Sequence, residues 1–355
     1  MLPPARLADV TPEWLTHALS ERWPGTLVDS VELGVPIHGT ATNVALTVRY
    51  ARQPSSQPLP LRMWLKGGYE PHFQFMAPSR IYEIEPLFYR ELAPRLSVQV
   101  PRCLYAGNDP VTHQGVLLLE DLASAGVRFG NATRPVSPDV VARGLSMLAR
   151  LHASTWNQSW PLDLWYVEDG IPGEGPAAGW YRQQTPDVFA RYLVERADAQ
   201  VPESVRAPER IVAAFWKLAA MSRDAPRCLI HSDSHLDNFY FNSALEPGLL
   251  DWQSPRIGCW AWDVSYFIIS ALDIEVRRHE ERALLAHYLH ELALCGAAAP
   301  NMDEAWLAYR RYNAYGLFVK IVNPDVFKPR AINVAWMSRH VQATEDLETF
   351  ESLGV

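Results

Sequence analysis

Residues 231–242 read HSDSHLDNFYFN, and residues 249–253 continue as LLDWQ. Two histidines, two aspartates and an asparagine fall within eight positions of the first segment, and apolar residues typical of strands lie on both sides of them. Three kinds of loop have this composition. These are an ordinary turn stabilised by Asp and Asn side chains, a metal-binding loop, and a loop of a phosphoryl-transfer site.

The spacing of the polar residues favours phosphoryl transfer. The kinase pattern H-x-D-x-x-x-x-N uses a carboxylate to orient the substrate hydroxyl and an amide oxygen on the same loop to bind magnesium. His231, Asp233 and Asn238 have this spacing, and Asp251 supplies a second acid after the next strand. A metal-hydrolase site built on His231 and His235 fits less well, because the residue after His231 is not the glutamate that such a site uses as a base.

Lysine is scarce in this chain, which contains 28 arginines and only four lysines, at positions 66, 217, 320 and 328. Lys66 is the only lysine before residue 217, and it ends the strand-like segment LRMWLKGG. A compact ammonium group on a flexible stem suits a phosphate contact, so we predict that Lys66 binds the phosphates of a nucleotide. We choose Glu85, rather than Glu83 or Glu91, as its ion-pair partner. We expect the helix that carries it to begin near Glu85, with Pro86 in its first turn.

The chain changes character near residue 120. Before it, alternating apolar residues predict an antiparallel sheet with strands at 44–48, 61–65, 98–100 and 116–119, and helix signals occur near residues 11 and 87. After it, the spacing of apolar residues predicts a mainly helical region. The expected helices span 137–152, 187–197, 208–221, 264–295 and 302–322.

Composition limits the function further. The formal net charge of -8 and the lack of long basic runs disfavour a nucleic-acid partner, because phosphate backbones attract clustered Lys and Arg. The four cysteines show no paired spacing, which favours a reducing cytoplasm over a disulfide framework. We find no targeting segment and no segment apolar enough to enter a membrane.

Several motifs together resemble the aminoglycoside phosphotransferase and choline kinase superfamily. DWQ in place of the protein-kinase DFG, and the EDL connector, make the ecdysteroid-kinase-like branch the most similar one. The segments that carry the resemblance cover most of the chain: HGTATNVALTV, WLKGG, EPLFYREL, VLLLEDLASAG, LARLHASTW, HSDSHLDN and DWQSPRIGCWAWDVSYF.

The resemblance implies an α+β fold of the bilobal protein-kinase-like type. A small antiparallel-sheet lobe that binds the nucleotide would span residues 1–119, and a connector would span 120–125. A larger, mainly helical lobe for catalysis and acceptor binding would span 126–355. The implied cofactors are ATP and Mg²⁺, and the implied partner is a small molecule with a hydroxyl group.

The resemblance also implies a role for each candidate residue. Asp233 would be the catalytic base, with Asn238 and Asp251 as magnesium ligands and Lys66, positioned by Glu85, on the phosphates. HSD replaces the usual HGD, so Ser232 must adopt backbone angles that glycine adopts more freely. The loop that covers the phosphates would contain Gly39, Thr40, Thr42 and Asn43. The connector backbone at Glu120, Asp121 and Leu122 would contact the adenine edge. His231 and Asp263 would support the catalytic loop structurally. His152 is expected to be an ordinary core histidine.

The acceptor is left open between two classes. Trp and Tyr are concentrated in residues 157–184 and 305–322, where aromatic walls would suit an apolar alcohol such as a steroid, polyketide or macrolide, unless these rings form core. Nearby acids would suit a cationic aminoglycoside or choline: Asp163, Glu168, Asp169 and Glu174. A non-catalytic nucleotide-binding protein or scaffold is the alternative of another class, although none of the four central site residues is lost.

Overall fold

The computed structural model describes residues 2–54, 58–157, 164–171 and 176–355. The chain divides into two compact units. The first contains Met1–Arg95, Val100–Val127 and Asp251–Gln253, and the second contains Leu96–Gln99, Arg128–Leu250 and Ser254–Val355. The first unit is built on an antiparallel sheet and the second is mainly helical, so the predicted α+β class is confirmed. Within the described ranges no helix is both long and apolar enough to cross a membrane.

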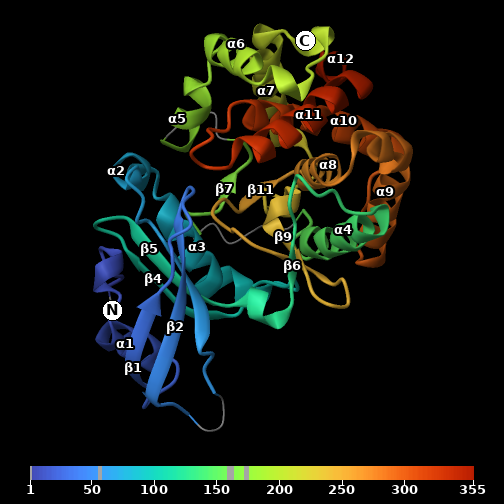
Figure 1. Ribbon diagram of the computed structural model, residues 1–355. Helices are drawn as coiled ribbons and strands as arrows, with labels where there is room; N and C mark the ends of the chain where they lie inside the picture. Colours follow the sequence, from blue (N-terminus) through green and yellow to red (C-terminus); the bar gives the residue numbers. More distant parts are fainter. Residues whose placement is uncertain (1, 55–57, 158–163, 172–175) are drawn as a thin grey trace. The chain divides into compact units, whose positions relative to one another are not determined.

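The first unit is a five-stranded antiparallel sheet (Figure 1). Its strand order is β1 (Leu27–Leu33), β2 (Thr42–Arg52), β3 (Arg62–Gly67), β5 (Gln114–Glu120) and β4 (Cys103–Asp109). Helix α1 (Pro12–Ser20) begins after Thr11, whose hydroxyl accepts a hydrogen bond from the Trp14 N–H, as its cap sequence predicts. The apolar face of α1 packs on the alternate, inward-facing residues of the sheet, including Leu46 and Leu65.

The strands predicted for the first 120 residues differ from the observed ones in two places. Residues 98–100 form no strand, and the edge strand β4 begins only at Cys103. Pro101 explains part of the difference, because a proline has no N–H to donate to a neighbouring strand. The strand β1, which pairs with β2, was not expected from the sequence.

The helix that carries Glu85 begins earlier than expected. Helix α3 spans Ile81–Leu87, so Pro86 lies inside it, and a π-helical turn (Phe88–Leu92) follows. Because Pro86 has no N–H, the carbonyl of Tyr82 one turn earlier receives no helical hydrogen bond from it. Gly115 of β5 lies against this carbonyl, so closely that a Cβ at Gly115 would be 1.7 Å from the oxygen. A glycine in the sheet therefore lets the proline-containing helix pack tightly.

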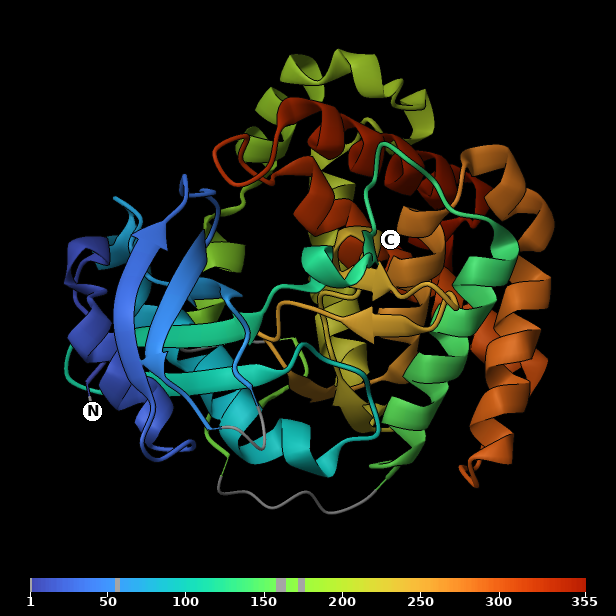
Figure 2. The same ribbon diagram turned by 60° about the horizontal axis from the view of Figure 1, so that its bottom comes forward.

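The second unit is organised around α8 (Trp260–Ala271), in which every residue is buried. A helix that is apolar on all sides belongs in the centre of a lobe, and helices α4 (Pro138–Ala153), α9 (Ile274–Leu294), α10 (Met302–Ile321) and α11 (Arg330–Asp346) contact it. Figure 2 shows α4, in green, and α9, in orange, side by side. The continuous helix expected over 264–295 is wrong, because the chain leaves helical geometry at Leu272 and starts α9 after Asp273.

Shorter elements complete both units. In the first, α2 (Phe73–Met76) precedes α3, and a 3-10 turn (Leu122–Ala125) follows β5. The second also contains helices α5 (Pro176–Gln183), α6 (Pro186–Glu195), α7 (Pro208–Met221) and α12 (Thr349–Leu353). Two small sheets hold its polar loop, with strand orders β10-β9-β6 and β7-β11-β8. Their strands are β6 (Arg128–Phe129), β7 (Glu168–Asp169), β8 (Cys228–Ile230), β9 (Phe239–Phe241), β10 (Pro247–Leu249) and β11 (Arg256–Gly258).

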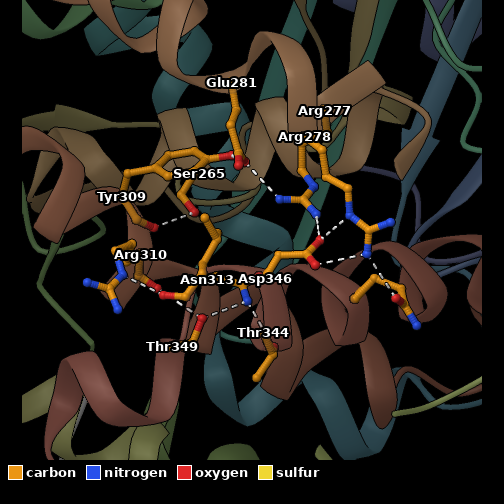
Figure 3. A network of polar contacts seen from close by, with 12 residues as sticks. Ser265, Arg277, Arg278, Glu281, Tyr309, Arg310, Asn313, Thr344, Asp346 and Thr349 are labelled. Carbon is orange, nitrogen blue, oxygen red and sulfur yellow. Dashed lines mark hydrogen bonds and ion pairs between the residues drawn. The ribbon is translucent and has the colours of Figure 1, made fainter. Parts of the chain in front are cut away.

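A buried charge network ties α9 to α10 and α11 (Figure 3). The guanidinium of Arg277 donates to Glu281 at 2.9 Å and also pairs with Asp346, and the hydroxyl of Tyr309 donates to Glu281 at 2.9 Å. Arg277 is 1% exposed, whereas the neighbouring Arg278, which also contacts Asp346, has a side chain that is 36% exposed. Two adjacent arginines thus contact the same acid, Asp346, although the side chain of one is buried and that of the other is partly exposed.

We expect these two arginines to differ strongly in their effect on stability. Arg277→Met should lower the free energy of unfolding by about 3–5 kcal/mol, because it leaves Glu281 without its buried partner. Arg278→Met should cost only about 0–1 kcal/mol, the usual range for an exposed ion pair. Urea unfolding of both variants measures the difference, and equal losses would show that burial of this network does not control its energy.

Candidate functional site

Lys66 lies at the centre of a polar cluster in the first unit. Its side chain alternates with the core residue Leu65 along β3 and so points to the opposite face of the sheet. The Nζ atom lies 2.6 Å from Glu85 Oε2 and 2.8 Å from Asp251 Oδ1. Burial disfavours the charge on Lys66, but the two carboxylates outweigh burial and raise its pKa above the ordinary value. The lysine is therefore held as an ammonium ion.

Glu85 is the glutamate that contacts Lys66, and the two others that were considered contact different groups. Glu83 is fully buried and accepts hydrogen bonds from Arg80, His113 and Asn108. Glu91 lies 3.6 Å from Arg90 near the surface. The position of Glu85 in α3 therefore places its carboxylate on the end of strand β3.

The DWQ segment is anchored to the same unit. Asp251 has a left-handed backbone conformation, with φ of 61°. The ring of the next residue, Trp252, stacks on Phe88 with ring centres 4.1 Å apart and an angle of 8° between the planes. The N–H of Trp252 donates to Glu85 Oε1 at 3.2 Å, so Glu85 holds both Lys66 and the residue after Asp251.

The polar loop of the second unit is organised by Asp263 on the buried helix α8. Its carboxylate accepts hydrogen bonds from the backbone N–H groups of His231 and Ser232, at 2.7 and 2.8 Å, and contacts His152 Nε2 at 3.2 Å. A carboxylate in a wholly buried helix requires such partners. His152 is buried and also contacts the Tyr288 hydroxyl at 2.8 Å, so it is the satisfied core histidine that the sequence predicts. The Nε2 of His231 donates to the carbonyl of Leu250 at 2.8 Å.

Ser232 adopts the glycine-like conformation that its position predicts, with φ of 65°. Its hydroxyl donates to the carbonyl of Ser254 at 2.6 Å. Left-handed geometry costs a non-glycine residue about 1–2 kcal/mol, and a hydrogen bond contributes about 0.5–1.5 kcal/mol. These two effects are similar in size and opposite in sign.

Replacements of Ser232 should therefore change stability in an unusual order. Ser232→Ala loses the hydrogen bond and keeps the strain, so we expect a loss of about 1 kcal/mol. Ser232→Gly loses the same bond but removes the strain, so its stability should stay close to that of the wild type. Chemical denaturation tests the order, and a glycine variant clearly less stable than the alanine variant would contradict it.

Asp233 and Asn238 meet on this loop. The Asn238 amide nitrogen donates to the Asp233 carbonyl at 2.8 Å and to its Oδ2 at 3.1 Å, which leaves the amide oxygen as a ligand atom. Burial opposes ionisation of Asp233, but His235, with Nε2 at 3.5 Å, and Lys320 outweigh it and lower the pKa of Asp233 below its ordinary value. Asp233 is therefore a carboxylate at neutral pH.

The donor atoms of Asn238 and Asp251 fit the chemistry of magnesium. Mg²⁺ prefers oxygen ligands and is usually bound by one or two carboxylates together with phosphate oxygens and water. Asn238 offers an amide oxygen, and Asp251 keeps one carboxylate oxygen beyond the one that contacts Lys66. The rejected metal site on His231 and His235 gains no support, since the described residues contain no group of three His, Cys, Asp or Glu side chains that could hold a metal.

The predicted phosphate-covering loop is closed by backbone pairing between Ile37 and Asn43, and Asn43 is the cross-strand partner of Lys66. Gly39 lies within this loop. The carbonyl of Thr40 accepts a hydrogen bond from the Tyr82 hydroxyl at 3.0 Å. The predicted phosphate contact of Thr42 does not fit this geometry, because its hydroxyl is buried and donates to Glu70 at 2.7 Å.

The side chains of the connector hold its own shape. Glu120 accepts a hydrogen bond from the Arg102 N–H at 2.7 Å. Asp121 caps the following 3-10 turn and accepts a hydrogen bond from Trp64 Nε1 at 3.1 Å. Leu122 is buried. These contacts fix the backbone that was predicted to meet the adenine edge.

A model of the ecdysteroid kinase-like family matches residues 41–298, which is well over half of the chain and includes Lys66, Glu85, the polar loop and the DWQ segment. The chain belongs to this family. A search of curated proteins finds no match.

Solved structures similar to this ecdysteroid kinase-like chain include small-molecule phosphotransferases. Spectinomycin phosphotransferase APH(9)-Ia, in complex with ADP and spectinomycin, aligns with a TM-score of 0.51 and 12% identity over 96% of this chain and 98% of its own. Choline kinase LicA from Streptococcus pneumoniae aligns with a TM-score of 0.47 and 13% identity, over 95% and 98%. At these identities the spectinomycin phosphotransferase supports the kinase-like fold alone, which agrees with the predicted fold class.

Most aromatic residues of the predicted acceptor segments form core in this ecdysteroid kinase-like chain. Tyr181 stacks on Phe215 with ring centres 5.2 Å apart, and Phe215 stacks on Phe318 at 3.9 Å. All three rings are buried, as is Tyr309. Among the described aromatic residues of the first segment, Trp165 has the most accessible ring and is 45% exposed. The alternative that these rings belong to the core therefore fits most of them.

The acids near the same segment are paired with arginines where they are described. Glu168 forms an ion pair with Arg256, and Asp169 forms one with Arg227. Arg256 also donates to the carbonyl of Gly170 at 3.1 Å. The other two acids that were considered lie outside the described residues: Asp163 and Glu174.

Sequence reasoning assigned no role to three residues that interact with Asp233 in the ecdysteroid kinase-like structure, or to an aromatic residue that packs against two of them. The first three are His235 in the polar loop, Tyr266 on α8 and Lys320 on α10, and the fourth is Trp336 on α11. One signal could have found Lys320, because the scarcity of lysine that singles out Lys66 applies to it equally. His235 stands out in the polar loop, but the sequence suggested only a metal-ligand role for it. Tyr266 and Trp336 carry no local signal, since apolar spacing alone makes them core residues.

Proposed function

We propose that this protein transfers the γ-phosphoryl group of ATP to a hydroxyl group of a small molecule. The observation that carries the proposal is the pair of organised clusters. One holds the ammonium of Lys66 between Glu85 and Asp251, and the other holds Asp233 and Asn238 on a loop braced by Asp263. An ammonium, two oxygen ligands and an ionised carboxylate are the parts that phosphoryl transfer requires.

The proposed mechanism depends mainly on position and charge. Asp233 accepts the hydrogen bond of the acceptor hydroxyl and aligns its oxygen for attack on the phosphorus atom. Lys66 neutralises phosphate charge, and Glu85 fixes its direction. Asn238 and Asp251 would hold Mg²⁺, which when bound would neutralise phosphate charge.

The remaining parts of the nucleotide site are proposed from the backbone. The connector around Glu120 to Leu122 would meet the adenine edge, because side-chain contacts fix its conformation. The loop from Gly39 to Asn43 would cover the phosphates through its N–H groups, and the hydroxyl of Thr42 is excluded from this role by its bond to Glu70.

The acceptor and the compartment belong to the same proposal. An alcohol that is largely apolar is favoured over a cationic aminoglycoside or choline, since both described acids near residues 164–171 are already paired with arginines. A pseudokinase or scaffold is the remaining alternative. All four cysteines are free thiols, which supports a reducing cytoplasm.

An acceptor panel tests the function directly. The purified protein is incubated with ATP and Mg²⁺ and with steroids, macrolides, aminoglycosides or choline-like amines, and ADP release and the gain of one phosphoryl group by the acceptor are measured together. We expect phosphorylation of at least one hydroxylated acceptor. Nucleotide binding without transfer to any acceptor class would favour the scaffold, and failure to bind nucleotide would overturn the proposal.

A further inference from the structure

A buried lysine that the proposed mechanism does not use lies beside Asp233. Lys320 is on α10 and is only 5% exposed. Its Nζ atom lies 3.5 Å from the centre of the Trp336 ring and 5.0 Å from that of Tyr266. Two aromatic faces at these distances attract a cation through the ring electrons. The protein's own ammonium group therefore occupies an aromatic box, which we define as the rings of Tyr266 and Trp336.

The aromatic box belongs to the same cluster as the proposed catalytic carboxylate. His235 has Nε2 at 3.5 Å from Asp233 and Nδ1 at 3.7 Å from Asp237, and its ring packs against Trp336 with centres 4.6 Å apart. Trp336 Nε1 donates to Asp237 at 3.2 Å. Asp233 and Asp237 both attract the charge on Lys320. The hydroxyl of Tyr266 is buried and interacts with Asp233.

Aromatic faces beside carboxylates would ordinarily suit an organic cation. Here that arrangement already contains a positive charge, so a cationic group of an acceptor would meet a like charge at close range instead of an empty aromatic site. A like charge in a poorly solvated site is strongly unfavourable, because little water remains to screen it. A neutral or anionic acceptor meets no such penalty.

A second, independent observation has the same consequence. The two described acids of the predicted acceptor segment, Glu168 and Asp169, each form an ion pair with an arginine. Arg256 is buried, so the pair that it forms with Glu168 is not a loose surface contact. Both carboxylates therefore already have a cationic partner within the protein.

We propose that Lys320 determines acceptor specificity, because its ammonium group fills the aromatic box beside Asp233 and thereby rejects acceptors that bring a cationic group there. The inference rests on the proposed kinase function and narrows it to neutral or anionic alcohols. It also predicts that the aromatic box binds a cation from solution once the charge on Lys320 is removed.

The charge on Lys320 can be removed by pH as well as by mutation. Burial lowers the pKa of Lys320 to about 8, although Asp233 and Asp237 oppose the change, and Lys328 adds to it. The other titratable groups around it are His235, Tyr266 and His340. As the pH rises through 8, Lys320 loses its proton and the repulsion disappears. A quaternary ammonium probe keeps its charge, so its affinity for the wild type should increase between pH 7 and pH 9.5.

Binding of choline, followed by ligand-detected NMR and calorimetry without nucleotide, tests the inference. The variants are Lys320→Met, which removes the charge at similar length, Lys320→Arg, which keeps it, and Lys217→Met, a control at an exposed lysine on α7. At pH 7 we expect choline to bind Lys320→Met at least ten times more tightly than it binds the wild type. The arginine variant and the control should behave as the wild type does.

Two results would overturn the inference. One is choline binding to the wild type at pH 7 as tight as to Lys320→Met, and the other is an affinity of the wild type that does not rise at pH 9.5. The pH comparison needs no mutation, so it holds even if Lys320→Met fails to fold. Because both measurements are of binding, they are separable from the proposed function: failure of phosphoryl transfer with a gain of choline binding would reject the kinase activity and keep the role of Lys320.

Discussion

Asp233→Asn should lower the rate of phosphoryl transfer by about 10²- to 10⁴-fold, the contribution usual for a positioned general base. The amide has nearly the same shape as the carboxylate but cannot take the proton of the acceptor hydroxyl. The loop should keep its shape, because its anchors are the backbone N–H groups of His231 and Ser232 on Asp263, not the Asp233 side chain. Single-turnover transfer to an acceptor, together with the nucleotide dissociation constant, measures the effect.

Nucleotide binding should change little in this variant, since the proposed phosphate contacts come from other residues. Asp187→Asn in the first turn of α6 is a matched control, because it makes the same chemical change at an exposed aspartate. Full activity of Asp233→Asn would reject Asp233 as the base. Loss of nucleotide binding in the same variant would show that the residue acts in binding and not in the transfer step.

Lys66→Met should reduce kcat/KM for ATP by about 10²- to 10³-fold, the range seen when one preorganised charge-stabilising donor is removed. The structure also shows why the variant can fold. Glu85 is left without its cation, but burial, together with the Asp251 carboxylate, raises the pKa of Glu85, so the side chain takes up a proton instead of remaining charged. Steady-state kinetics and nucleotide titration separate the loss in binding from the loss in turnover.

Three controls make the Lys66 result specific. Lys217→Met removes an exposed lysine and should have no effect. Lys66→Arg keeps the charge but replaces the compact ammonium by a planar group, and it should recover little activity because the Nζ atom sits between two carboxylates 2.6 and 2.8 Å away. Thermal unfolding of each variant separates loss of function from loss of fold. Wild-type activity of Lys66→Met would exclude this lysine from the nucleotide site.

Local chemistry in the sequence was enough to predict several parts of the structure. Alternating apolar residues in β2 and β3 predicted the central hairpin, and Thr11 predicted the start of α1, since both depend on nearest neighbours. The replacement of glycine by Ser232 predicted a left-handed residue in the polar loop, and the structure has one. The choice of Glu85 among three glutamates agrees with the ion pair, although the helix that carries it begins at Ile81.

Other features could not be found along the chain, because they depend on partners far away in sequence. Pro86 can lie inside α3 only because Gly115, on a strand 29 positions later, leaves room at the Tyr82 carbonyl. The hydroxyl of Thr42 is directed to Glu70 by packing within the first unit. Rings that looked suited to an acceptor are mostly core, since the same aromatic composition serves both purposes.

The amino-acid sequence by itself predicted a sheet in the first part of the chain, helices in the rest, and the candidate set Lys66, Asp233, Asn238 and Asp251, because spacing within one loop and alternation along one strand are local properties. Only the tertiary structure decided how these groups are charged and held: Lys66 between two carboxylates, Asp263 under the polar loop, and Lys320 inside an aromatic box. Burial and charge pairing depend on residues that are distant in the chain and adjacent only after folding.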